Sequence, residues 1–353
     1  MRPILSILTL FAFITLSSFN SSDDNLPPYQ VKSFKGNLTN LRVETSGGSI
    51  SVEGGQSSET KVEMYVRPNN WFGKDELSKE EIAERLKDYD ITLDAQGGTV
   101  IATAKRKNQD GSWSWKNGVS ISFKVYTPRN MNTDLRTSGG SIRLANLTGQ
   151  QNFATSGGSL NINSIEGNIN GRTSGGSITM ANCRSGRNGE RIDMKTSGGS
   201  ITASESTGDL HLTTSGGSLR LTNLKGQIDA HTSGGSVQAN DIDGSLKAGT
   251  SGGSVRLTGI AGSVDASTSG GSIEAEITRL GEYVRLSGSA GSVRVRMPLN
   301  KGLDLDLRGN RVTTASLSNF DGSIEKTRVV GRLNGGGIPV KISSGSGSVH
   351  LND

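Results

Sequence analysis

Acidic and basic side chains recur at a fixed spacing in the second half of this chain. Asp193, His211 and Asp229 follow one another at intervals of 18 residues, and the series continues with Lys247, Asp265 and Arg285. Two carboxylates beside an imidazole could act as the acids and bases of a polysaccharide hydrolase or lyase. If each interval of 18 residues forms one layer of a stack, Asp193 and Asp229 lie about 10 Å apart. This is slightly beyond the roughly 6.5–9.5 Å that separates the two catalytic carboxyl groups of inverting glycosidases.

A second interpretation of this series is a charge ladder. With His211 counted as basic, the signs alternate along the series, and stacked neighbours would lie about 4.8 Å apart. Such a ladder fixes the register of the layers and avoids like-charge contacts, at about 0–1 kcal/mol for each exposed pair. No motif supplies a protected cleft, so the sequence favours the ladder and predicts that the protein is not an enzyme.

An internal repeat must position these side chains. From Thr137 onward the string Thr-Ser-Gly-Gly-Ser recurs every 18 residues, apart from one step of 23 residues with an insertion around Arg184–Gly189. Counted from the threonine, positions 6, 8, 11, 15 and 17 are usually apolar and position 13 is usually glycine. Alternating apolar residues predict short strands with one buried face, and glycine permits tight corners. The string begins at Thr45, Thr137, Thr155, Thr173, Thr196, Thr214, Thr232, Thr250 and Thr268.

A unit of this size cannot bury its apolar face alone, whereas stacked copies can. The sequence therefore predicts an all-β protein, a parallel β-solenoid (β-helix) of 18-residue coils with an N-terminal cap containing one short helix. Roughly ten coils would make a rod of about 50 Å. A β-sandwich is the alternative, but it needs antiparallel pairing and less regular loops.

The regular repeats occupy residues 137–297 and divide the chain. Residues 23–136 are predicted to form an N-terminal cap and the first coils, and residues 298–353 the C-terminal coils and cap. Ser78 and Glu81 form a capping box for a helix near residues 79–89. Strands are expected at Ile91–Leu93, Thr99–Ala104 and Val119–Tyr126.

Three further features of the sequence bear on binding. Trp113 and Trp115 share one face of an extended segment, where exposed indoles could stack on sugar rings; packing within the cap is the alternative. Position 7, the other outward series, is irregular, reading Arg, Asn, Thr, Thr, Arg, Gln, Arg and Glu from Arg143 to Glu274, and so does not form a threonine array for ice binding. Cys183 stands at an apolar position, so we expect a small buried side chain.

Residues 1–22 are expected to be a signal peptide. Arg2 precedes a 13-residue apolar run, Ile4–Leu16, too short for a bilayer core of about 30 Å. No cysteine follows, so a lipoprotein anchor is not indicated. The mature protein is predicted to be extracytoplasmic: periplasmic, on the cell surface or secreted after Sec export, with no transmembrane segment after signal removal.

The chain offers no motif for a cofactor or a metal. It has no GxxxxGK[ST] phosphate loop, no GxSxG elbow and no GGxGxDxUx calcium repeat, and its three histidines share no repeat position. The formal net charge is only +5, from 38 basic and 33 acidic residues, without a basic stripe. No nucleic-acid partner is therefore expected.

The chain resembles the bacterial putative-adhesin family over about residues 36–351. The resemblance lies in the repeated Thr-Ser-Gly-Gly-Ser-[Ile/Leu/Val] turns, in the segment Val119–Pro128 that leads into the repeats and in the closing segment Gly335–Leu351. This resemblance implies an exported β-strand-repeat protein of the cell envelope. The leading hypothesis is a non-catalytic adhesin or envelope binding or scaffold protein, whose partner is a cell-surface or envelope component, glycan or protein. A β-helix polysaccharide-active enzyme and a purely structural envelope protein are the alternatives.

Overall fold

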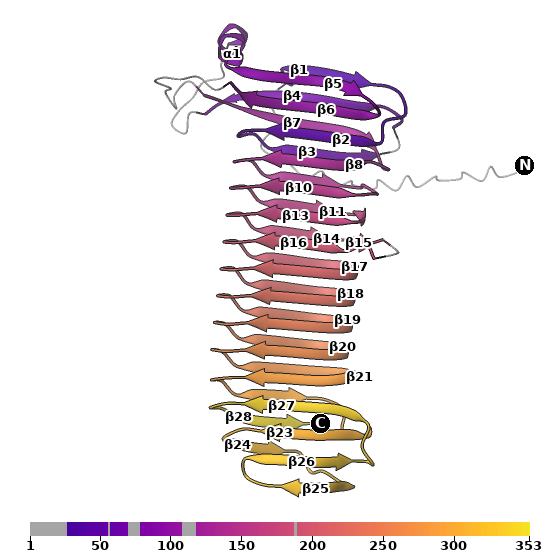
Figure 1. The fold of residues 1–353 in the computed structure, drawn as a ribbon, viewed down its shortest axis with the longest axis vertical. Coiled ribbons are helices and arrows are strands. Elements are labelled where there is room, and N and C mark those ends of the chain that lie inside the picture. Colours follow the sequence, from indigo (N-terminus) through magenta and orange to yellow (C-terminus); the bar gives the residue numbers. More distant parts are fainter. Residues whose placement is uncertain (1–26, 56, 70–77, 108–117, 187–188) are drawn as a thin grey trace, which may run out of the picture.

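The computed structural model describes residues 27–55, 57–69, 78–107, 118–186 and 189–353. These residues form an all-β fold with one helix, and the strands join a single, mostly parallel sheet. Figure 1 shows the strands stacked one above another along the longest axis. The sequence-based prediction of an all-β protein with parallel pairing and one short helix is confirmed.

In the first part of the stack, each layer consists of short strands that pair in parallel with the next layer. Thr155 pairs with Thr173, and Leu160 pairs with Ile178. Across the 23-residue step Thr173 pairs with Thr196, so the strands keep the same register on both sides of the insertion. The strands here are β8 (Asn132–Thr137), β9 (Ile142–Ala145), β10 (Gln151–Thr155), β11 (Leu160–Asn163), β12 (Glu166–Gly167), β13 (Ile169–Thr173), β14 (Ile178–Ala181), β15 (Arg184–Ser185) and β16 (Ile192–Thr196).

In the second part, one long strand runs through almost the whole repeat unit. Thr214 pairs with Thr232 and Thr232 with Thr250, so in the first four long strands each residue faces the residue 18 positions further on. The register shifts between the fourth and the fifth, where Asp265 faces Arg285. The long strands are β17 (Ile201–Thr214), β18 (Leu219–Thr232), β19 (Val237–Thr250), β20 (Val255–Thr268) and β21 (Ile273–Gly288).

At the N-terminal end, the order of strands in space differs from their order in the sequence. β2 lies between β6 and β8, and β3 lies between β7 and β9, so the segment from β4 to β7 folds back over the first layer. β1 and β4 pair antiparallel, as do β5 and β6. The strands are β1 (Gln30–Phe34), β2 (Asn40–Thr45), β3 (Ile50–Gly55), β4 (Thr60–Pro68), β5 (Tyr89–Gln96), β6 (Thr99–Arg106) and β7 (Val119–Pro128).

The helix α1 spans Lys79–Leu86 and begins at the predicted capping box. Ser78 Oγ accepts a hydrogen bond from the Glu81 N–H, while the Glu81 carboxylate accepts one from the Ser78 N–H. The helix ends earlier than expected because Tyr89 already belongs to β5. No helix within the described part of the chain is long and apolar enough to cross a membrane.

The C-terminal end folds back in a similar way. β27 and β28 pair with β21 and β22, whereas β23, which precedes them in sequence, lies one layer further out. β25 and β26 form an antiparallel hairpin there. The strands are β22 (Val293–Arg296), β23 (Leu303–Arg308), β24 (Arg311–Thr314), β25 (Phe320–Ile324), β26 (Arg328–Leu333), β27 (Ile338–Ser344) and β28 (Ser348–Asn352).

The core is a set of apolar columns that follow the stack. In the unit that begins at Thr214, the side chains at positions 6, 8 and 11 are Leu219, Leu221 and Leu224, all fully buried. Cys183 occupies position 11 of an earlier unit and is 2% exposed, as the sequence predicted. Alternate residues point outward, so each strand presents one dry and one polar face.

Each Thr-Ser-Gly-Gly-Ser string forms a corner that joins one layer to the next. Thr232 Oγ1 donates a hydrogen bond to the carbonyl of Gly217 in the preceding layer at 2.7 Å. The same oxygen accepts a hydrogen bond from the N–H of Gly235 at 3.3 Å. The hydroxyl therefore serves one part-buried carbonyl and one turn N–H, and the contact repeats at the other corners.

The fourth residue of the corner must be glycine because neighbouring backbones approach closely there. A Cβ on Gly217 would lie 2.1 Å from the carbonyl oxygen of Gly199 in the layer before it. The third residue has more room, since a Cβ on Gly216 would lie 3.4 Å from the nearest atom, the Gly198 oxygen. The two glycines of one corner therefore differ in what they tolerate.

Position 10 adopts a left-handed backbone that the sequence analysis did not identify. Asn146, Asn182 and Asn223 have φ of 58°, 54° and 53°. Asparagine and aspartate are the non-glycine residues that adopt this conformation most readily, which explains their recurrence at this position. The Asn223 amide also donates to the Glu205 carboxylate of the preceding layer at 2.6 Å.

We expect Gly217→Ala to lower the free energy of unfolding by about 1–3 kcal/mol, because the new methyl group overlaps a fixed backbone carbonyl. Gly216→Ala is the matched control and should change stability by less than about 0.5 kcal/mol. Urea unfolding followed by circular dichroism and by fluorescence measures both variants. Equal losses in the two variants would show that close backbone approach is not the constraint at this corner.

We expect Thr232→Val to lower the free energy of unfolding by about 1–3 kcal/mol, because it leaves a part-buried carbonyl and a turn N–H without a partner at nearly constant volume. Thr222→Val, at an exposed position of the same strand, controls for the loss of a hydroxyl. The same unfolding measurement applies. A Thr232→Val protein as stable as the control would contradict the role assigned to the corner hydroxyl.

Candidate functional site

The predicted acid–histidine series is in register. Asp193, His211 and Asp229 are direct neighbours on β16, β17 and β18. The series continues through Lys247 and Asp265 to Arg285 in the same register.

The partners of these side chains differ from those the sequence suggested. His211 Nε2 lies 3.1 Å from Asp209 Oδ1, while its Nδ1 lies 3.8 Å from Asp229 Oδ2. Asp229 Oδ1 lies 2.6 Å from His231 Nε2, at ion-pair distance but without the alignment of a hydrogen bond. Asp193 is held by Lys195 instead, at 2.9 Å. The three predicted residues therefore belong to two separate groups of contacts.

The sequence analysis missed Asp209, His231 and Lys195 because it followed one column along the stack. Each of these residues lies two positions from a member of the series on the same strand, so both side chains point to the same face. The imidazoles of His211 and His231 are 35% and 40% exposed. This group can exchange protons with solvent, but it lies outside both depressions described below.

A second outward surface lies on the strands at positions 7 and 9 of the later layers. We call it the arginine face and define it as the outward side chains of residues 220–222, 238–240, 256–258, 274–276, 294–296 and 350–352. At position 7, Arg220 pairs in register with Gln238, and Gln238 with Arg256. Arg256 then pairs with Glu274, and Glu274 with Arg294. Arginines therefore occupy every second layer.

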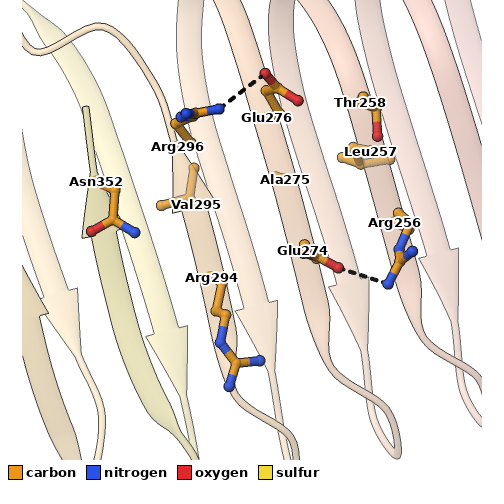
Figure 2. A pocket seen from close by; sticks show the side chains of 10 residues that line it. All are labelled: Arg256, Leu257, Thr258, Glu274, Ala275, Glu276, Arg294, Val295, Arg296 and Asn352. Atoms are coloured by element: carbon orange, nitrogen blue, oxygen red, sulfur yellow. Dashed lines mark ion pairs between the residues drawn. The ribbon is translucent and has the colours of Figure 1, made fainter.

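Two ion pairs cross this face. Arg256 Nη2 lies 2.9 Å from Glu274 Oε2, and Arg296 Nη1 lies 3.5 Å from Glu276 Oε1. All four side chains are well exposed, so each pair contributes only about 0–1 kcal/mol to stability. Arg294 takes part in neither pair (Figure 2). Within the described residues, Arg294 and Arg220 have no carboxylate partner.

The four paired side chains and Arg294 line a shallow depression of about 290 Å³, which does not include Arg220. Its floor is formed by apolar residues of neighbouring strands, among them Ala275 and Val295, which are buried against the core. The polar side chains of the depression therefore stand on a rigid, close-packed support. A second depression, of about 350 Å³, lies near the N-terminal end and is lined mainly by polar residues, including Arg42, Asn132 and Asp134.

Position 7 was interpreted as irregular from the sequence because no single residue type repeats there in every unit. The signal that was passed over is an alternation, with arginine at Arg220, Arg256 and Arg294 separated by Gln238 and Glu274. A search for the same residue type at 36-residue intervals would have found Arg220 and Arg256.

Three other predicted features concern chemistry. Trp113 and Trp115 lie outside the described residues. Among the described residues, no group of three or more His, Cys, Asp or Glu side chains is arranged to hold a metal ion. Burial raises the pKa of the Cys183 thiol to about 11, so this side chain is a neutral thiol at neutral pH.

Comparisons with known proteins found similar solved structures but no sequence relative. No protein family matches the sequence, and no curated protein matches it. A cell adhesion protein from Clostridium sporogenes, described as putative, is 11% identical with a TM-score of 0.18, covering 92% of this chain and 97% of its own. A putative adhesin from Parabacteroides merdae is 12% identical with a TM-score of 0.30, covering 92% and 96%. A putative lipid binding protein from Parabacteroides distasonis is 14% identical with a TM-score of 0.29, covering 93% and 98%.

Two of these names agree with the family resemblance drawn from the sequence, and that resemblance is confirmed to this extent. Identities of 11–14% and TM-scores of 0.18–0.30 carry no argument about what this chain binds. Its function must be argued from its own surface.

We expect Cys183 to resist thiol reagents at pH 8 in the native protein and to react fully in denaturant, because the buried thiol does not ionise until about pH 11. Counting labelled thiols with a chromogenic disulfide measures this, and Cys183→Ala should give no signal in either state. Full labelling of native protein at pH 8 would contradict this account.

Between the ordinary cysteine pKa of 9.0 and about 11, the unfolded chain loses a proton that the native protein keeps at Cys183. The free energy of unfolding should therefore fall as pH rises through this range.

Proposed function

We propose that this chain is an exported, non-catalytic binding protein of the cell envelope, and that its stacked layers are a parallel β-solenoid. The arginine face is the proposed contact surface. The observation that carries the proposal is the presence of two arginines, Arg220 and Arg294, that have no carboxylate partner in the described part of the chain and stand on a flat and rigid face. Uncompensated guanidinium groups on such a support are suited to anionic or polar partners.

The shape of the surface supports binding rather than catalysis. The two depressions hold about 290 and 350 Å³, at the lower end of the roughly 300–1,000 Å³ of small-molecule sites, and both are open and polar. The exposed acid–histidine group lies on another face, without a surrounding wall that would exclude water from a reaction. An extended face gains affinity by adding many weak contacts along a long partner.

Export is part of this proposal. Removal of the predicted signal peptide would place the stack in the periplasm, on the cell surface or in the medium. The single cysteine is buried at an apolar position, so the fold does not depend on the redox state of its compartment.

The experiment compares the chain from about Ser22 with two variants, Trp113→Ala/Trp115→Ala and Arg220→Gln/Arg294→Gln. Each is titrated against purified envelope polysaccharide and envelope protein, and the length of the polysaccharide is measured before and after. We expect saturable binding, unchanged polysaccharide length and weaker binding only by the arginine variant.

Other outcomes would overturn parts of this proposal. Binding lost only in the tryptophan variant would move the site to residues 113–115. Shortened polysaccharide, with activity lost in Asp229→Asn, would establish an enzyme. No saturable binding to either preparation would favour a purely structural envelope protein.

A further inference from the structure

We infer that the arginine face binds a linear acidic polysaccharide whose carboxylates lie on every second sugar, with the polymer running along the stack. This inference rests on the proposed function and adds the chemical class and direction of the ligand. The row formed by Arg220, Arg256 and Arg294, here called the arginine row, supplies the contacts that set the spacing.

The spacing follows from the register of the strands. Arg220 and Arg256 are separated by one intervening strand, β19, and Arg256 and Arg294 by another, β21. Parallel neighbours lie about 4.8 Å apart, so successive arginines lie about 9.6 Å apart. This distance is close to the length of two linked pyranose rings. Figure 1 shows that these layers stack without a break, which keeps the row straight.

The charges along the row leave room for an anionic partner. Glu274 is paired with Arg256 and Glu276 with Arg296, while Arg220 and Arg294 have no carboxylate partner among the described residues. Arg256 is 64% exposed and its guanidinium retains further N–H donors beyond the pair with Glu274. A guanidinium can bind a carboxylate through two parallel hydrogen bonds.

Uncharged polar residues fill the remaining outward positions of the face on β18, β19 and β20. Thr222, Gln238, Asn240 and Thr258 lie beside or between Arg220 and Arg256 and are exposed or half-buried. Their hydroxyl and amide groups can both donate to and accept from sugar hydroxyls. A neutral sugar between Arg220 and Arg256 would therefore meet neutral polar side chains, and one between Arg256 and Arg294 would meet Glu274, whose charge is paired with Arg256.

The same geometry disfavours nucleic acid. Phosphates follow one another at about 3.4 Å along a strand of DNA, so most would have no arginine opposite them on a row spaced at about 9.6 Å. Single-stranded nucleic acid is also held by stacking on aromatic rings. The arginine face, all of whose residues are described, contains no Phe, Tyr or Trp side chain, and its one imidazole, His350, lies at the end of the face beside Arg294.

The test uses the chain from about Ser22 and four polymers. Hyaluronan carries one carboxylate for every two sugars, polygalacturonate one on every sugar, dextran none, and duplex DNA is the phosphate polymer. Affinities are measured by biolayer interferometry over a salt series. We expect the tightest binding to hyaluronan, weakening as salt increases.

The variant Arg220→Gln/Arg256→Gln/Arg294→Gln should weaken hyaluronan binding about tenfold or more, because several exposed charge contacts are lost together. Arg172→Gln/Lys225→Gln/Lys247→Gln removes the same charge from exposed positions outside the arginine face. Its affinity for hyaluronan should stay within about twofold of the unmodified chain.

A third variant, Arg220→Gln/Gln238→Arg, keeps the charge but changes the spacing of the arginines. It should weaken hyaluronan binding and leave polygalacturonate binding nearly unaffected.

Four results would overturn the inference. Equal affinity for dextran would show that charge is not recognised, and tighter binding of DNA would assign the row to phosphate polymers. Equal losses in the two triple variants would show that net charge alone matters. If the chain binds envelope preparations but no acidic polysaccharide, this inference fails while the proposed function stands; if it binds neither, both fail.

Discussion

The structure depends on the hydrogen bond from the corner threonine of each layer to a glycine carbonyl of the layer before it. Thr232 and its counterparts place one hydroxyl where it satisfies a part-buried carbonyl and a turn N–H together. The glycine that follows keeps the neighbouring backbones close enough for this contact. Because the corner specifies the register of each pair of layers, the apolar columns inside and the polar columns outside align as a consequence.

Alignment of the outer columns turns a sequence repeat into rows of chemically related groups. In the register set by the corners, a substitution at position 7 or 16 changes one point of a row and leaves the layer contacts intact. Asp229 can therefore approach His211 and His231, and Arg256 can approach Glu274, without cost to the core. Exposed pairs of this kind contribute about 0–1 kcal/mol each, so the outer surface varies with little effect on stability.

Periodicity in the sequence was sufficient to predict the paired layers, the burial of Cys183 and the start of the helix at Ser78, since each depends on local pattern or on a fixed spacing. It could not predict that β2 lies between β6 and β8, because a period does not say which copy becomes a neighbour in space. The contact of Asp193 with Lys195 was missed for a related reason, as it joins positions 16 and 18 within one strand. The arginine row was passed over because its residues alternate.

The regular geometry of the interior and the varied side chains of the exterior support the proposed binding role. Catalytic groups must converge around one point and exclude water, whereas parallel strands direct side chains side by side from a nearly flat face. A flat row gains affinity by repetition, since each added contact along a long partner is an intramolecular step. Its rigidity limits the entropy lost on binding, because Arg220, Arg256 and Arg294 already stand on close-packed strands. The corner threonines thus determine how far apart those arginines stand, and so which spacing of anionic groups the face can match.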